Sequence, residues 1–114
     1  MPVRTIKVLR AARKLVANPE TWTSGANARD RSGLALGSTS AGAVCWCAYG
    51  AVIRSAVSLG VHARAVDDLD DFLNRLAARR NLGSLVEAND RHGRLAALQV
   101  IDDAIAELEV RGAA

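Results

Sequence analysis

Residues 34–53 contain no charged side chain, and this run constrains the fold more than any other feature of the chain. A helix that spans a bilayer needs about 20 apolar residues, so the run is nominally long enough. Its first part, however, is rich in residues typical of loops and helix caps: Gly37, Ser38, Thr39, Ser40 and Gly42. We therefore expect no membrane span. We expect instead a buried helix over residues 41–59, capped by the serines and threonine and ended by Gly60.

Hydrophobic periodicity predicts one helix before this central helix and one after it. Residues 5–17 place apolar side chains on one stripe and basic side chains on the opposite face. Asn18-Pro19 ends that helix, because the residue before a proline avoids helical dihedrals. Residues 65–80 carry an apolar stripe with aspartates in the first half and arginines in the last, an order that complements the helix dipole.

The last part of the chain predicts one more helix. Asn89-Asp90 would cap it, and an apolar stripe of nearly ideal helical spacing extends to about Val110. The stripe comprises Leu95, Leu98, Ile101, Ile105 and Leu108. Residues 84–88 are ambiguous between a helical turn and a strand.

The segment over residues 20–40 is irregular and predicts a small β-hairpin. Asp30-Arg31-Ser32-Gly33 has turn chemistry, with aspartate first and glycine fourth, and short runs at 26–29 and 34–36 flank it. Irregular segments of this length are often functional. We expect Trp22 to pin the segment to the core.

These elements predict one domain over residues 1–114: a mainly α, compact bundle of about four helices around a central apolar helix, with a small β-hairpin, an α+β arrangement staying open. The net charge of +3 is low for a dedicated nucleic-acid binder. No signal peptide is evident, and two cysteines one residue apart do not form a disulfide framework. We expect a cytoplasmic protein with reduced thiols, whose small core makes a homodimer or another protein partner a reasonable expectation.

Three motifs stand in order along the chain: Trp22-Thr23-x-Gly25-x-x-Ala28-Arg29-Asp30-x-x-Gly33, then Cys47-x-x-Gly50-Ala51, then Asn89-Asp90. Together they resemble a family of small bacterial and phage proteins of unknown function, over most of the chain. The resemblance implies no activity. It implies that Cys47 is the recurring cysteine and that Cys45 is incidental. Ala88 departs from the pattern, which often has a large aromatic residue before Asn-Asp. The candidate cluster is therefore Trp22, Arg29, Asp30, Cys47, Asn89 and Asp90.

A thiol nucleophile is one hypothesis for this cluster. Cys45-Trp46 superficially resembles the Cys-Trp pair that cysteine peptidases place at the start of a buried helix. Cys45 or Cys47 would attack, with His92 as the base and Asn89 orienting it. On the predicted helix both cysteines lie beyond the first turn, where the dipole no longer lowers a thiol pKa. We favour the hypothesis that Cys47 is a buried, unreactive side chain.

Asn89 and Asp90 are likewise expected to have a structural role and not a catalytic one. Capping is the commonest task of Asn and Asp directly before an amphipathic helix. A charge-assisted hydrogen bond between Arg29 and Asp90 would then hold the irregular segment against the last helix.

Two other site types are disfavoured. Cys45, Cys47, His62 and His92 could supply four metal ligands, but cysteines two apart on a helix point to different sides, so we expect no metal and no cofactor. The basic face of the first helix comprises Arg4, Lys7, Arg10, Arg13 and Lys14. No aromatic residues interleave with it as stacking platforms for nucleic acid would require.

The sequence therefore favours a non-catalytic accessory or interaction protein of a bacterial or phage cytoplasm. A thiol-dependent hydrolase and a weak nucleic-acid binder are the alternatives. The biological process and the identity of any partner are not specified by the residues.

Overall fold

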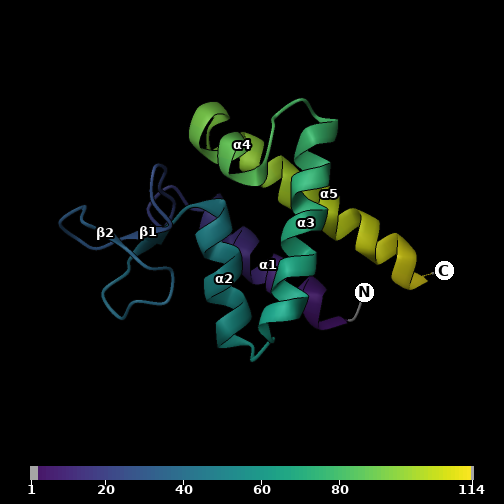
Figure 1. The fold of residues 1–114 in the computed structure, drawn as a ribbon, viewed down its shortest axis with the longest axis horizontal. Coiled ribbons are helices and arrows are strands. Elements are labelled where there is room, and N and C mark those ends of the chain that lie inside the picture. The colour runs from purple at the N-terminus through teal and green to yellow at the C-terminus, as the bar shows by residue number, and fades with distance from the viewer. Residues whose placement is uncertain (1–2, 114) are drawn as a thin grey trace.

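The computed structural model describes residues 3–113, which form five helices and one three-stranded sheet. The helices are α1 (Val3–Ala17), α2 (Ala48–Ser58), α3 (Ala63–Arg79), α4 (Leu85–His92) and α5 (Arg94–Ala113). The strands are β1 (Ala28–Arg29), β2 (Ala35–Leu36) and β3 (Cys45–Trp46). The strands and their loops extend from one end of the helical body, away from the ends of the chain (Figure 1). The prediction of a mainly helical fold with a small β-hairpin is confirmed.

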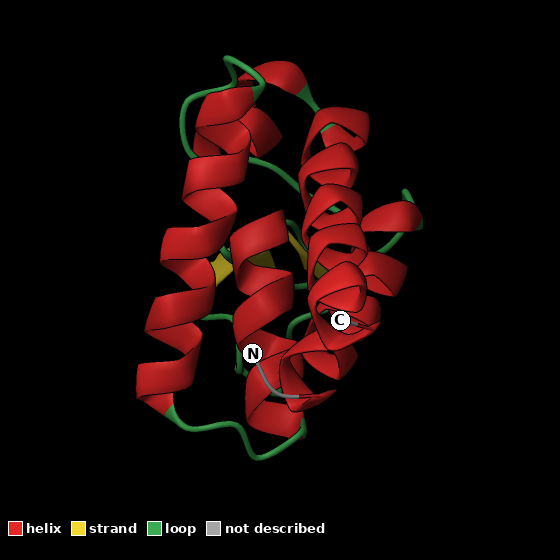
Figure 2. Cartoon of the chain, turned by 90° about the vertical axis from the view of Figure 1, so that its right-hand side faces the viewer, coloured by secondary structure: helices red, strands yellow, loops and turns green. Residues whose placement is uncertain are grey.

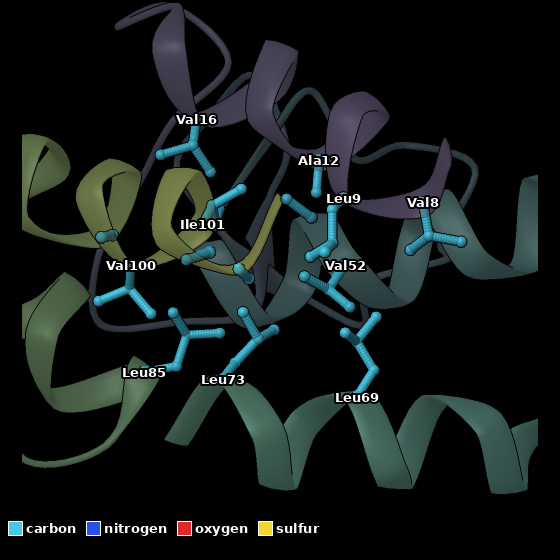
Figure 3. Packing of buried hydrophobic residues seen from close by; sticks show 14 of the residues in the cluster. Val8, Leu9, Ala12, Val16, Val52, Leu69, Leu73, Leu85, Val100 and Ile101 are labelled. Carbon is cyan, nitrogen blue, oxygen red and sulfur yellow. The ribbon is translucent and has the colours of Figure 1, made fainter. Parts of the chain in front are cut away.

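The core takes one apolar stripe from every helix. α1 packs against both α2 and α5, and α3 and α4 cover the remaining side. In Figure 3, Leu9 of α1, Leu73 of α3 and Ile101 of α5 point towards a common centre. Leu9, Leu73 and Ile101 have no exposed surface, and burial of one such side chain contributes about 1.5–3 kcal/mol. Seen from the side, the helices lie alongside one another with the strands behind them (Figure 2).

The predicted central helix is too long at its start. It begins at Ala48, because residues 45 and 46 pair with β1 as a third antiparallel strand, with Cys45 opposite Arg29. Cys47 is the N-cap, in place of the predicted serines and threonine. The predicted end is close, since α2 stops at Ser58 and Gly60 has a φ of +69°, a left-handed conformation typical of the residue just past a helix. Val57 is 59% exposed, so α2 is not buried on every side.

The β-hairpin forms as its turn residues predict. β1 and β2 are antiparallel, with Ala28 opposite Leu36. The Asp30 carboxylate accepts hydrogen bonds from the backbone N–H groups of Ser32 and Leu34 and from the Ser32 hydroxyl. These bonds hold the pKa of Asp30 below its usual value, the bond from the Ser32 side chain most strongly. Asp30 is therefore a turn-forming residue in this structure.

The prediction that Asn89-Asp90 cap the last helix is wrong. Residues 85–92 form the separate helix α4, whose N-cap Ser84 accepts a hydrogen bond from the Glu87 N–H at 3.2 Å. Ser84 and Glu87 have the spacing of a capping box, and this local signal starts a helix five residues earlier than expected. Gly93, with a φ of +95°, separates α4 from α5. One member of the predicted stripe on α5 is also wrong, since Leu95 is 64% exposed.

The uncharged run does not form a membrane helix. Within residues 3–113, none of the helices combines the length and the apolar character that crossing a bilayer requires.

Candidate functional site

Asn89 is the centre of the candidate cluster, and it lies in the middle of α4 with no exposed surface. Its Oδ1 accepts hydrogen bonds from the Trp22 indole Nε1 at 2.8 Å and from the Ala48 backbone N at 3.0 Å. Its Nδ2 donates to the Thr23 carbonyl at 3.1 Å and to Asp90 Oδ1 at 2.9 Å. One side chain therefore joins the irregular segment, the start of α2 and α4, and all four of its hydrogen-bonding positions are used.

Asp90 extends this network to the next turn of the irregular segment. Its Oδ1 also accepts a hydrogen bond from the backbone N of Gly25 at 3.0 Å. Gly25 has a φ of +79°, a conformation that side chains rarely adopt. We call the connected residues the Asn89 hub: Trp22, Thr23, Gly25, Ala48, Asn89 and Asp90.

The predicted pair between Arg29 and Asp90 does not form. Arg29 donates instead to the Thr23 hydroxyl at 3.1 Å and to the carbonyl groups of Ser24 and Gly33, both at 3.0 Å. Arg29 thus ties the irregular segment to itself, because three acceptors of that segment lie closer to its guanidinium than the hub carboxylate does. Asn89 and Asp90 do hold the segment, but through backbone groups and Trp22.

Cys47 lies beside the hub, at the N-cap of α2 rather than within the helix as predicted. Its Sγ accepts a hydrogen bond from the Gly50 N at 3.3 Å and lies 4.0 Å from Asn27 Oδ1. The side chain is 3% exposed, so the prediction of burial is confirmed. Burial raises the pKa of the Cys47 thiol, and the Asp90 charge adds to this, while the Gly50 N–H acts in the opposite direction. Because burial dominates, the thiolate is disfavoured at neutral pH.

The other residues of the nucleophile hypothesis do not join Cys47. Cys45 is half-buried on β3, with its Sγ 3.9 Å from the Arg29 carbonyl. His92 is exposed in the last turn of α4, and over residues 3–113 no hydrogen bond joins it to either cysteine. His62 is the N-cap of α3, where its Nδ1 accepts from the Ala65 N. The described part of the chain brings no three His, Cys, Asp or Glu side chains together as metal ligands.

A groove between α1 and α2 is the second site, and the sequence interpretation missed it. Its volume is about 550 Å³. The lining residues are Lys7, Arg10, Ala11, Lys14, Leu15, Trp46, Arg54, Ser55, Ser58 and Leu59. The available signal was the basic face of α1, whose charges are compatible with docking of a phosphate or a partner as well as with a solvated helix surface. The Arg54 guanidinium lies over the Trp46 ring, 5.5 Å from its centroid.

Because Asp90 belongs to the hub and His92 does not, we expect their alanine variants to differ in the free energy of unfolding. Asp90→Ala removes the acceptor for the Gly25 N–H and should lower the free energy of unfolding by about 1–2 kcal/mol. His92→Ala, the matched control on the same helix, should stay within about 0.5 kcal/mol of wild type in urea denaturation. Two variants that both unfold like wild type would contradict the structural role of Asp90.

The chain belongs to a family of unknown function (DUF6197), whose family model matches residues 1–107. No curated protein and no solved structure matches it. The resemblance to a family without an assigned activity is therefore confirmed, and the function has to be argued from the two sites.

Proposed function

We propose that the protein is a single-domain, non-catalytic accessory protein that acts by binding a partner in a bacterial or phage cytoplasm. The observation that carries the proposal is the complete use of Asn89 in structural hydrogen bonds. A residue that orients a catalytic base needs a free donor or acceptor directed at that base. Within residues 3–113, every fully buried side-chain nitrogen or oxygen has a hydrogen-bond partner, so Asn89 offers no unused polar atom to a catalytic base.

A thiol-dependent hydrolase is the alternative that one observation favours. Cys47 lies at the start of α2, where the helix dipole and the Gly50 N–H stabilise a thiolate. Against it stand the burial of the thiol and the exposed position of His92 on another helix. We propose that Cys47 serves as a helix cap, since a sulfur that accepts the Gly50 N–H satisfies a group the helix itself leaves unpaired.

Thiol labelling distinguishes these two functions. In a Cys45→Ala variant, Cys47 is the remaining thiol, and native protein at neutral pH should not react with Ellman's reagent on the timescale at which denatured protein reacts fully. The Cys47→Ala variant is the matched control, and it reports the half-buried Cys45. Rapid modification of Cys47 in the folded Cys45→Ala variant would refute the non-catalytic proposal and support the hydrolase.

A further inference from the structure

We propose that the groove between α1 and α2 is a docking site for an acidic amphipathic segment of a partner protein. This inference rests on the proposed binding function and names the chemistry of the partner. Four cations face the groove, Lys7, Arg10 and Lys14 from α1 and Arg54 from α2. No aspartate or glutamate of the described residues lines it. The groove therefore complements a negatively charged occupant.

Three of the four cations, Lys7, Lys14 and Arg54, form no ion pair within the described residues. Arg10 forms an ion pair with Glu109 at 3.0 Å, and both side chains are more than half exposed. Across residues 3–113, no carboxylate lies within ion-pair distance of Lys7, Lys14 or Arg54. By contrast, the neighbouring Arg13 on α1 is paired with Asp102 of α5. Lys7, Lys14 and Arg54 are thus available to the carboxylates of a partner, whereas Arg10 and Arg13 are paired with carboxylates of α5.

The floor of the groove selects an occupant that also carries apolar side chains. Ala11 and Leu15 of α1, and Leu59 directly after α2, contribute aliphatic surface between the cations. The Trp46 ring is only 8% exposed, and Arg54 lies over it. The indole therefore offers no free face on which a nucleic-acid base could stack. Carboxylates above an aliphatic floor are the surface of an acidic amphipathic segment.

The length of the groove favours a peptide over a single small anion. A smaller hollow of about 150 Å³, lined by Arg4, Lys7 and Leu59, shares two residues with the main groove and lengthens it. From Arg4 to Lys14, the outermost cations of the two hollows, the axis of α1 advances roughly 15 Å. Cations spaced over that distance cannot all contact one phosphate or carboxylate, whereas glutamates on successive turns of a helix can reach them in sequence.

The test uses the full-length protein and a fluorescently labelled helical peptide of about 12 residues, with glutamates on one face and leucines on the other. Its anisotropy should report saturable binding that weakens as salt is added. When the peptide is added, changes in the NMR chemical shifts of the protein's backbone amides should be largest for the α1 and α2 residues that line the groove. A peptide with glutamines in place of the glutamates, and one with serines in place of the leucines, should each bind at least about tenfold more weakly.

Two double variants of equal charge locate the site. Lys7→Gln with Lys14→Gln should weaken peptide binding about tenfold, and Arg64→Gln with Arg75→Gln on α3 should leave it unchanged. Absence of peptide binding, or equal loss in both double variants, would overturn the inference. Tighter binding of a single-stranded oligonucleotide to the same groove would overturn it in favour of nucleic acid. The thiol-labelling experiment is independent of peptide binding. If Cys47 is unreactive and the acidic peptide does not bind, this inference is refuted while the non-catalytic proposal stands.

Discussion

Replacing Asn89 with alanine is expected to lower the free energy of unfolding by about 3–5 kcal/mol. The substitution leaves the Trp22 Nε1–H and the Ala48 N–H without their acceptor in a buried position. Each buried donor that loses its partner costs about 1–3 kcal/mol, because water cannot replace the lost acceptor. The lost donor to the Thr23 carbonyl adds to this cost. Urea denaturation followed by far-ultraviolet circular dichroism measures the difference.

Asn74→Ala is the matched control, since Asn74 also accepts a backbone hydrogen bond, from the Leu85 N at 2.9 Å, at the start of a helix. It is half-buried, so solvent reaches the groups that the substitution exposes, and the expected cost is about 1 kcal/mol. Equal costs for the two variants would show that Asn89 contributes no more than an ordinary helix-capping residue.

Gly50→Ala is expected to destabilise the protein by about 2–3 kcal/mol, even though alanine is the better helix former. A Cβ atom built at Gly50 would lie 2.0 Å from the carbonyl oxygen of Asn27. That obstacle is backbone, and it is held by the hydrogen bond from the Cys47 N to the same oxygen, so it cannot move without disrupting the start of α2. The close neighbour of Gly50 is thus the loop before β1.

Gly112→Ala is the control for this substitution. Gly112 also lies in a helix, and an added Cβ would meet no atom within 4 Å. Its melting temperature should equal that of wild type or exceed it slightly, because alanine favours the helix. Gly50→Ala should melt roughly 10 °C below wild type, since 1 kcal/mol corresponds to about 4–8 °C in a small domain. An unchanged melting temperature for Gly50→Ala would contradict the close approach of the two segments.

The elements that the sequence predicts well are those specified by local chemistry. Asn18-Pro19 marks the end of α1, and the turn at Asp30-Arg31-Ser32-Gly33 places β1 and β2 on either side of it. In each case the signal comes from residues within a few positions of the element, either a proline that excludes helix or an aspartate that bonds to the turn.

The elements that the sequence misplaces depend on partners far along the chain. Nothing local distinguishes Cys45 and Trp46 from the helix that follows them. They become a strand because the second edge of β1, sixteen residues earlier in the chain, accepts them. The prediction that Asn89 caps the last helix was wrong for a different reason. Both Ser84 and Asn89 are residues typical of an N-cap, and the helix begins after Ser84, the earlier of the two. The hub itself joins residues 22 and 89, a separation over which periodicity and capping rules make no prediction.

A double-mutant cycle between Trp22→Phe and Asn89→Ala tests most directly whether Asn89 joins the irregular segment to the helices in one network. Trp22→Phe removes the indole N–H and keeps an aromatic ring, so the cycle isolates the hydrogen bond to Asn89 Oδ1. The expected coupling energy is about 1–3 kcal/mol, with the double variant less destabilised than the sum of the two single variants. Effects that add within about 0.5 kcal/mol would contradict the hub and return Asn89 to consideration as a functional residue.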